Sequence, residues 1–284
     1  MTSPTLFDAV HWLRNADGLL ITAGAGIGVD SGLPDFRGDA GLWQHYPVLG
    51  ERKLSFAEIA NPLAFDDDAK LAWGFYGHRL RLYRETMPHR GFAILQSIAA
   101  TMPHGAFVFT SNVDGQFQKA GFDETRIVEC HGSIHHLQCT RDCGAPLWAA
   151  TPFEPEIDLL ACRMLSPLPL CPNCGALARP NIMMFDDWSW QSERSDRQAE
   201  RYRQWRGQFQ RLVVIELGAG VAIPTVRQFS ERSQAPLIRI NPLHADAPAS
   251  ATAFPIKQGA LDGLTMLGNA LADEITEASP TADT

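Results

Sequence analysis

The sequence predicts an α/β fold in which a parallel β-sheet is covered by helices on both faces. Short apolar runs that are typical of buried strands lie at residues 19–22, 106–110, 126–129, 212–217 and 237–240. Segments with apolar residues at helical spacing separate these runs, and strands that alternate with helices favour a parallel sheet. A glycine-rich turn follows the first run directly, as expected where a buried strand ends in a tight loop.

The helices expected around this sheet follow in chain order. Ser3 and Pro4 mark the start of the first helix, because proline is tolerated at the first helical position. Its apolar face consists of Leu6, Phe7, Val10 and Leu13. Further helices are expected within residues 51–85 and at residues 92–102, 198–210 and 261–271. Residues beyond 272 are polar and are expected to fray.

The composition of the 284 residues argues against several classes of protein. A net charge of −8 argues against nonspecific binding to nucleic acid, and no apolar run is long enough to span a membrane. Residues 1–15 lack the basic start and apolar block of a secretory signal. Six cysteines in a chain of this length do not suggest a disulfide scaffold, so we expect a cytoplasmic protein with reduced thiols.

Residues 24–38 carry the most specific motif of the chain and read GAGIGVDSGLPDFRG. Glycines after a strand let the backbone approach a pyrophosphate closely, and a following helix N-terminus can hold the anion. The usual dinucleotide fingerprint would have a third glycine opening a helix and an acidic residue about 20 positions later. Here a Pro-Asp-Phe-Arg segment follows instead, and its proline, opposite charges and aromatic ring predict a ligand-binding loop.

This motif resembles the signature of the sirtuins, the NAD-dependent protein deacylases, which reads Gly-Ala-Gly-x-Ser-x-x-Ser-Gly-Ile-Pro-Asp-Phe-Arg. The shared positions are Gly24, Ala25, Gly26, Ser31, Gly32, Pro34, Asp35, Phe36 and Arg37. Leu33 replaces the isoleucine, and Gly28 replaces the first serine and so removes a hydroxyl from the pocket. The resemblance implies NAD binding by Gly24, Ala25, Gly26, Asp35, Phe36 and Arg37.

The resemblance also implies how the chain is organised. A Rossmann-type NAD-binding domain would consist of residues 1–50, 86–133 and 186–275. The other parts would be a helical insertion at residues 51–85, a zinc-binding small lobe at residues 134–185 and a flexible tail at residues 276–284.

Four cysteines form two close pairs, Cys139 with Cys143 and Cys171 with Cys174. A structural zinc ion prefers four thiolates in a tetrahedron, and paired cysteines on tight turns supply two ligands each. The alternative interpretation is that they are buried, reduced thiols, and Cys162 could replace one ligand. Because four protein ligands leave no open position for a substrate, we expect a zinc ion here to stabilise the lobe and not to catalyse.

Residues 110–114 follow a strand and read TSNVD, where sirtuins have Thr-Gln-Asn-Ile-Asp. The resemblance implies that Asn112 orients the ribose and a water molecule, and that Asp114 binds the nicotinamide carboxamide. Ser111 takes the place of the glutamine within the cofactor site, and Phe117 replaces a histidine. Without the resemblance, an Asn-x-Asp sequence after a strand is more often a turn.

Residues 129–133 read ECHGS and resemble the Glu-Leu-His-Gly-Ser of the family, which implies that His131 is the general base. A histidine suits this role because its ordinary pKa lies near neutrality. His135 and His136 are expected to face the zinc lobe or solvent. In the implied reaction the acyl-lysine oxygen attacks the nicotinamide ribose, His131 removes a ribose hydroxyl proton, and water releases lysine and O-acyl-ADP-ribose.

The segment RPNIMMFDD resembles the family segment that pairs as a strand with the substrate peptide. This implies substrate contacts by Ile182 and Phe185. Asp186 replaces a glycine, and its carboxylate could favour basic residues beside the acyl-lysine. The following Trp188 and Trp190 either form a wall of the acyl channel or cap the core.

The segment ELGAG ends the strand at residues 212–217, where sirtuins have Gly-Thr-Ser-Leu. Gly218, Ala219 and Gly220 are expected to admit the phosphate or ribose of NAD, although both hydroxyls are absent. Asn241 follows the next strand and matches the asparagine that faces the adenosine ribose in the family.

Tyr76 and Arg79 lie three positions apart, which places both side chains on one helix face. A phenol hydroxyl and a guanidinium together suit a carboxylate. Sirtuins that prefer succinyl- or malonyl-lysine resemble the chain at these positions. The alternative interpretation is a solvated arginine beside a half-buried tyrosine on an amphipathic helix.

With the resemblance, the sequence predicts an NAD-dependent protein-lysine deacylase that acts on succinyl or malonyl as well as acetyl groups. Its substrates would be acyl-lysine proteins or peptides, NAD its cosubstrate, and one zinc ion its structural metal. An NAD glycohydrolase or ADP-ribosyltransferase is an alternative, which the lost hydroxyls near Gly218 motivate. A non-enzymatic sensor of NAD or ADP-ribose is a third, and the retained His131 argues against it.

Overall fold

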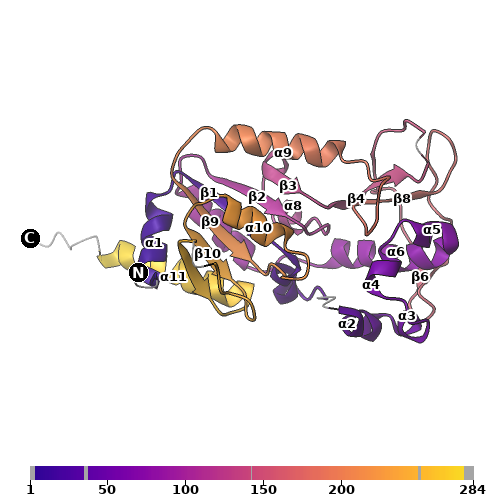
Figure 1. The fold of residues 1–284 in the computed structure, drawn as a ribbon, viewed down its shortest axis with the longest axis horizontal. Helices are drawn as coiled ribbons and strands as arrows, with labels where there is room; N and C mark the ends of the chain where they lie inside the picture. The colour runs from indigo at the N-terminus through magenta and orange to yellow at the C-terminus, as the bar shows by residue number, and fades with distance from the viewer. Residues whose placement is uncertain (1–3, 35–37, 142, 249–250, 278–284) are drawn as a thin grey trace, which may run out of the picture.

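A computed structural model describes residues 4–34, 38–141, 143–248 and 251–277. The chain forms a large lobe built on a β-sheet and a small lobe of short helices and strands, which lie side by side (Figure 1). The first helix has Thr5 as its N-cap, whereas Ser3, expected to mark its start, lies outside the described residues. Within the described ranges, no helix combines the length and apolar character needed to cross a membrane.

Among the described residues, the large lobe contains six parallel strands in the order β11-β10-β9-β1-β2-β3. The strands are β1 (Gly18–Ala23), β2 (Ala106–Thr110), β3 (Ile127–Glu129), β9 (Leu212–Leu217), β10 (Leu237–Ile240) and β11 (Ala253–Ile256). The five strands predicted from apolar runs are confirmed. Strand β11 was not predicted, because it is an edge strand that contains Pro255, and proline is tolerated in a sheet only at such edges.

Helices cover both faces of this sheet, as predicted. One face packs against α1 (Leu6–Asn15), α7 (Gly91–Ala100) and α11 (Ala260–Glu277). The other face packs against α9 (Glu193–Arg206) and α10 (Thr225–Arg232). Every residue of β1 and β9 is buried, which is typical of parallel strands enclosed between two layers of helices.

Within the part of the chain that the structure describes, the small lobe contains five helices and two small antiparallel sheets. The helices are α2 (Gly38–His45), α3 (Pro47–Glu51), α4 (Phe56–Ile59), α5 (Leu63–Asp67) and α6 (Ala69–Glu85). One sheet has the order β5 (Trp148–Ala149), β4 (Gly132–Cys139), β8 (Ala178–Ile182), and the other pairs β6 (Ile157–Asp158) with β7 (Arg163–Met164).

One hydrophobic core joins these helices to these strands. Trp73 and Tyr76 of α6 are at most 1% exposed and belong to the same apolar cluster as Ile134 of β4 and Ile182 of β8. The indole N–H of Trp73 donates a hydrogen bond to the carbonyl of Ala178 in β8 (2.9 Å). The segments predicted as a helical insertion and as a zinc-binding lobe therefore pack as one unit.

Candidate functional site

Two glycine-rich loops meet at the carboxyl edge of the sheet, where the chain order reverses between the neighbouring strands β1 and β9. The N–H of Gly26, after β1, donates a hydrogen bond to the carbonyl of Gly218, after β9 (3.1 Å). A Cβ atom at Gly218 would lie 2.4 Å from the Cα of Gly26, and Gly218 has a φ of +57°. Glycine is therefore required there. At Gly220, by contrast, a Cβ atom would meet no described atom within 4 Å, so the backbone is accessible.

After Gly24 the chain forms the short 3₁₀ helix η1 (Ala25–Ser31) and not an α-helix. Gly32 ends it in the left-handed conformation, with a φ of +84°. The hydroxyl of Ser31 accepts a hydrogen bond from the N–H of His89 (2.9 Å), which ties the loop to the start of α7. Three residues of this loop that were predicted to bind NAD lie outside the described ranges: Asp35, Phe36 and Arg37.

The loop after β2 lies directly against the loop after β1. The side-chain amide of Asn112 donates a hydrogen bond to the carbonyl of Gly24 (3.1 Å). The N–H of Ser111 and the hydroxyl of Thr110 both donate to the carbonyl of Ala23, at 3.2 and 2.9 Å. Asn112 is 9% exposed. The structure thus brings Gly24, Ser111 and Asn112 together at the rim of one site.

Asp114 lies buried below this rim. Burial raises the pKa of its carboxyl to about 6, although the N–H of Gln116 donates to one carboxylate oxygen (2.9 Å) and favours the ionised form. The backbone carbonyl of Asp114 lies 2.9 Å from Nε2 of His135. Because a carbonyl can only accept, this contact assigns the ring proton to Nε2. Above about pH 6 the carboxylate of Asp114 is a buried acceptor.

His135 was expected to face the zinc lobe or solvent, and this prediction is wrong. Its ring instead bonds to Asp114 and packs over Gly115, where a Cβ atom would lie 2.8 Å from the imidazole. The pairing of β4 with β8 shifts register between Ser133 and Leu137, and this irregularity sets which side chains of β4 face the site. The sequence carries no signal for such a shift.

His131 occupies the turn between β3 and β4, next to the loop after β2. Two backbone hydrogen bonds tie these segments together, from Cys130 to Thr110 (2.9 Å) and from Ile134 to Val113 (3.0 Å). Burial lowers the pKa of the His131 imidazole below its ordinary value. The ring is therefore neutral at pH 7 and able to accept a proton.

Glu129 precedes this turn and anchors it from behind. Its side chain is 1% exposed and forms an ion pair with Arg194 at the start of α9. Its backbone carbonyl accepts a hydrogen bond from the hydroxyl of Ser195 (2.8 Å), and its N–H donates to the side chain of Gln198 (3.0 Å). The end of β3 is thus fixed by α9 just before His131.

Tyr76 and Arg79 are both buried, so the interpretation of Arg79 as a solvated arginine is wrong. The guanidinium carbon lies 5.8 Å from the ring centre of Tyr76. Its Nε and Nη2 atoms both donate to the hydroxyl of Tyr83, at 3.0 and 2.7 Å. Tyr83 was not predicted, although its position one turn after Arg79 on the same helix could have identified it.

The segment predicted to pair with a peptide begins beside the turn that carries His131. Ile182 ends β8, and the N–H of Met183 donates to the carbonyl of His131 (2.9 Å). The N–H of Phe185 donates to the carbonyl of Ala60 after α4 (2.9 Å). Both amides are engaged within the chain, so a peptide strand would pair here through other backbone groups.

The end of this segment forms a tight, pinned turn. Asp186 is exposed and has a φ of +53°, a left-handed conformation that favours glycine and tolerates aspartate. The next side chain, Asp187, is buried and pairs with the buried Arg179 (2.8 Å). Trp188 is 98% exposed, so it neither caps the core nor packs into a channel wall. Trp190 keeps its indole nitrogen buried.

Asn241 and Phe117 both support the fold. The side-chain amide of Asn241 donates to the carbonyl of Ala219 (3.0 Å), and its oxygen accepts from the N–H groups of Leu243 and His244, at 3.1 and 2.9 Å. Asn241 therefore fixes the glycine loop after β9. Phe117 is 2% exposed and belongs to the apolar core of the large lobe.

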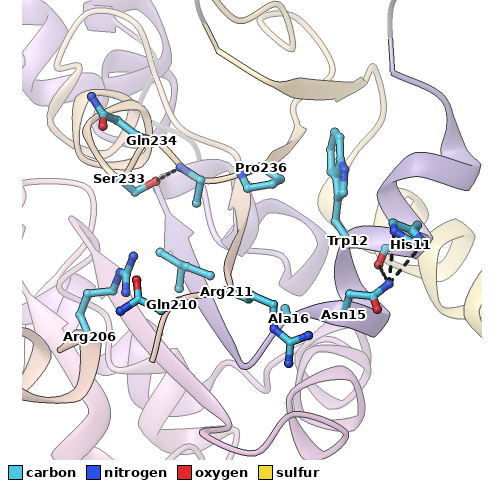
Figure 2. Close-up of a pocket in the computed structure, with 12 residues that line it drawn as sticks. His11, Trp12, Asn15, Ala16, Arg206, Gln210, Arg211, Ser233, Gln234 and Pro236 are labelled. Carbon is cyan, nitrogen blue, oxygen red and sulfur yellow. Dashed lines mark hydrogen bonds between the residues drawn. The ribbon is translucent and has the colours of Figure 1, made fainter. Parts of the chain in front are cut away.

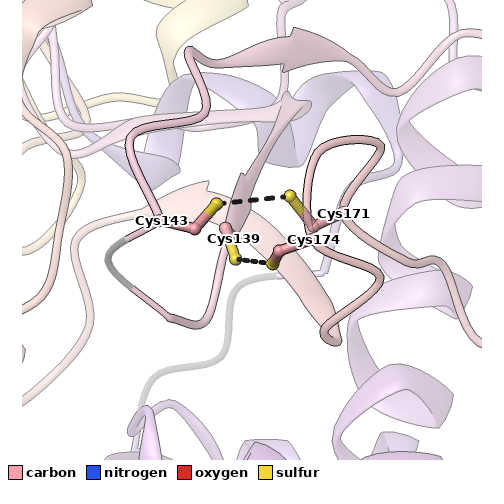
Figure 3. Close-up of side chains that lie close together, drawn as sticks. All are labelled: Cys139, Cys143, Cys171 and Cys174. Atoms are coloured by element: carbon pink, nitrogen blue, oxygen red, sulfur yellow. Dashed lines mark hydrogen bonds between the residues drawn. The ribbon is translucent and has the colours of Figure 1, made fainter.

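The four cysteines predicted as zinc ligands lie together (Figure 3). Their sulfur atoms lie within 4.8 Å of one another, and Cys139–Cys174 and Cys143–Cys171 are each 3.6 Å apart. A tetrahedral zinc ion with Zn–S bonds of about 2.3 Å places its sulfurs about 3.8 Å apart, so the set fits. Cys162 is buried elsewhere and does not belong to the cluster, so its proposed substitution as a ligand is wrong.

A cavity of about 330 Å³ lies at the amino ends of β1, β9 and β10, on the opposite edge of the sheet (Figure 2). Its charged groups are engaged with the chain itself. Arg211 pairs with Asp17, and Arg206 donates to the carbonyl of Phe209 (2.8 Å). The candidate site is therefore the carboxyl edge, where the glycine loops, Asn112 and the neighbouring loop of His131 converge.

Residues 24–205 match the model of the Sir2 family. The NAD-dependent protein deacylase of Aquifex aeolicus is 33% identical over 169 residues, which cover 60% of this chain and 62% of that protein. The NAD-dependent protein deacylase 2 of Pyrobaculum aerophilum is 36% identical over 169 residues, covering 59% of this chain and 58% of that protein. The matches thus span about three fifths of these relatives. A solved Sir2 homologue in complex with NAD is 22% identical, with a TM-score of 0.71 over 96% of each chain, and shares the fold.

Proposed function

This chain belongs to the Sir2 family, and on that basis we propose that it removes acyl groups from protein lysine side chains with NAD as cosubstrate. Curated relatives that are 33% and 36% identical are named NAD-dependent protein deacylases. The observation that carries the proposal is His131, a half-buried histidine of lowered pKa beside the loop of Asn112 and Asp114. The products would be nicotinamide, free lysine and O-acyl-ADP-ribose.

The residues at the carboxyl edge suit NAD. Gly26 lies in close contact with Gly218, and a Cβ atom at Gly220 would meet no described atom within 4 Å. Glycine loops of this kind let a pyrophosphate approach the backbone. Asn112 would hold the ribose at the rim. The carboxylate of Asp114 would accept a hydrogen bond from the carboxamide. When bound, NAD would supply a ribose carbon whose bond to nicotinamide is broken during deacylation.

In this proposal the chain itself supplies a base and a dry environment. His131 would accept a proton from a ribose hydroxyl, and its lowered pKa keeps the imidazole neutral for that step at pH 7. The backbone contacts of Cys130 and Ile134 fix the turn, so the ring approaches the ribose in one orientation. The half-buried position of His131 would limit the access of water.

We further propose that succinyl and malonyl groups are substrates as well as acetyl. Arg79 is a buried cation beside the ring of Tyr76, and a guanidinium presents a planar fork of donors that suits a carboxylate. Tyr76 belongs to the apolar core that also contains Val113, beside the cofactor loop, and Ile182, beside the peptide segment. Arg79 lies next to the ring of Tyr76. An acyl chain that enters between these segments would end near Arg79.

Incubation of the protein with NAD and either acetyl- or succinyl-lysine peptides tests the proposal. Mass spectrometry should detect nicotinamide and deacylated peptide, and His131→Ala should lower the rate at least about a hundredfold, as expected for loss of a general base. Arg79→Met should lower succinyl turnover more than acetyl turnover. If NAD is bound but neither peptide is deacylated, the proposed activity is refuted.

The backbone near Gly220 is open, and the threonine and serine hydroxyls that sirtuins have in this loop are absent. These two features make NAD hydrolysis the second candidate function. Nicotinamide release is therefore measured with and without acyl peptide. Release that depends on peptide supports deacylation. An equal rate without peptide identifies an NAD glycohydrolase and excludes the deacylase proposal.

A further inference from the structure

Helix α6 presents three buried polar side chains on one face. Tyr76, Arg79 and Tyr83 lie at positions i, i+3 and i+7, so they follow one another along the same side of the helix. Their exposed fractions are 1%, 9% and 7%. Tyr76 and Arg79 were predicted as acyl-site residues, whereas Tyr83 was not.

Tyr83 makes the most direct contact with the guanidinium of Arg79. Its hydroxyl oxygen accepts from Nε (3.0 Å) and from Nη2 (2.7 Å), so one phenol oxygen binds one edge of the planar guanidinium. The guanidinium carbon also lies 5.1 Å from the ring centre of Phe75 and 5.5 Å from that of Tyr83. Two donors on one acceptor, together with ring contacts, fix the plane of a side chain that otherwise rotates freely.

The same tyrosine is tied to the cofactor side of the site. The backbone carbonyl of Tyr83 lies 3.4 Å from the side-chain amide of Gln116, which donates to it. The N–H of Gln116 in turn donates to the carboxylate of Asp114 (2.9 Å). The last turn of α6 is therefore held against the loop after β2, and Arg79 is placed relative to that loop through Tyr83.

We infer that Tyr83 is a positioning residue for the acyl site: it orients the Arg79 guanidinium toward the carboxylate of a succinyl- or malonyl-lysine. This inference rests on the proposed function, because it needs an acyl-lysine in the site. The phenol retains its own O–H as a donor, since Arg79 donates to Tyr83 and not the reverse. An acetyl group carries no terminal carboxylate and gains nothing from this arrangement.

Tyr83→Phe tests the inference, because it removes one oxygen and keeps the ring. We expect the KM for a succinyl-lysine peptide to rise about tenfold, the cost of one charge-assisted hydrogen bond. The KM for the matching acetyl peptide should rise at least five times less. Tyr202→Phe, on α9 in the large lobe, removes a phenol oxygen outside the site and should leave both values unchanged.

A double-mutant cycle separates positioning from a general loss of packing. If Tyr83 acts through Arg79, then Tyr83→Phe adds no further increase in succinyl KM once Arg79→Met is present. Binding of both peptides, measured by isothermal titration calorimetry without NAD, gives a readout that does not depend on turnover. Thermal unfolding of each variant shows that the protein is folded.

The outcomes distinguish this inference from the proposed function. Equal increases in KM for both peptides, or additive effects of the two substitutions, overturn the positioning role while deacylation stands. A wild-type protein that binds no succinyl peptide also overturns it, even where acetyl peptide is turned over. If peptides bind with the expected pattern but neither is deacylated, the proposed activity fails and the assignment of Tyr83 stands.

Discussion

The two lobes are stabilised in different ways. In the large lobe, six parallel strands lie between two layers of helices, and apolar clusters fill both sides of the sheet. In the small lobe, strands of two to eight residues share a core with α6, and four thiolates gather at one end. The proposed cofactor edge is thus built on a packed sheet, whereas the proposed acyl and peptide side depends on a lobe that a metal ion would complete.

The largest expected effect comes from removing a thiolate. Cys171→Ser should release the zinc ion and destabilise the small lobe by about 4 kcal/mol, or roughly 10 °C in Tm, because bound metal contributes directly to folding. Zinc content by atomic emission and thermal unfolding by circular dichroism measure this. Cys162→Ala is the matched control, since this buried thiol is outside the cluster. Loss of zinc from the control alone would contradict the assignment.

Gly218→Ala tests the close backbone contact between the two glycine loops of the large lobe. The added Cβ would lie 2.4 Å from the Cα of Gly26, at a φ of +57° that alanine disfavours. We expect a loss of about 3 kcal/mol from strain and overpacking together, measured by urea unfolding. Gly220→Ala is the control, because its Cβ would meet open space. Equal losses for both variants would show that the contact between the two glycine loops is not the cause.

The same contrast explains what the sequence could predict. The runs at residues 106–110, 212–217 and 237–240 match strands β2, β9 and β10 at both ends, because strands buried on both faces are largely apolar. In the small lobe, short strands such as β5 and β8 carry no such pattern, since their register depends on contacts distant in sequence. In this lobe the sequence predicted a helical insertion, a zinc-binding segment and a peptide-pairing segment, but not the short strands or their pairing.

The residues of the candidate site also fall into two groups, those that the sequence predicted and those that it did not. Residues on strand ends, such as Asn112 and His131, were identified by motif, and the structure brings their loops together. The supporting contacts of His135 and Tyr83 were missed, because they arise from a register shift and from the packing of a helix against a loop. The motifs thus indicate the residues that we propose to meet a ligand, and packing determines which residues support them.

Asp114 lies where the two lobes meet and links stability to pH. Burial raises the pKa of its carboxyl to about 6, above the value of about 3.9 expected in the unfolded chain. The folded state therefore prefers the protonated carboxyl, and stability falls as pH rises from 4 through 6, by about 2 kcal/mol. Asp114→Asn removes this cost, so the variant should be more stable than wild type at pH 8 but not at pH 4.

Urea unfolding at a series of pH values measures this difference, and the variant should also bind NAD more weakly. Asp66→Asn replaces an exposed residue on α5 and retains Asp114, so it is the control, and its stability should fall with rising pH as that of wild type does. If Asp114→Asn is less stable than wild type at pH 8, the carboxylate is stabilised by its hydrogen bonds and burial does not dominate its titration.

Asp186→Gly has the smallest expected effect and tests whether the small lobe selects peptides. Asp186 is exposed in a left-handed conformation, so glycine should relieve strain and raise stability by about 0.5 kcal/mol.

If the exposed carboxylate attracts basic residues beside the acyl-lysine, the variant should lose a two- to threefold preference for such peptides, as expected for one solvent-exposed ion pair. Competition between peptides with lysine or alanine at the flanking positions measures the preference, and it should weaken further at high salt. Asp273→Asn, on α11 in the large lobe, should change neither property. A preference that survives in Asp186→Gly would assign peptide selection to other residues of the segment after β8, and the difference between the lobes would then lie in stability alone.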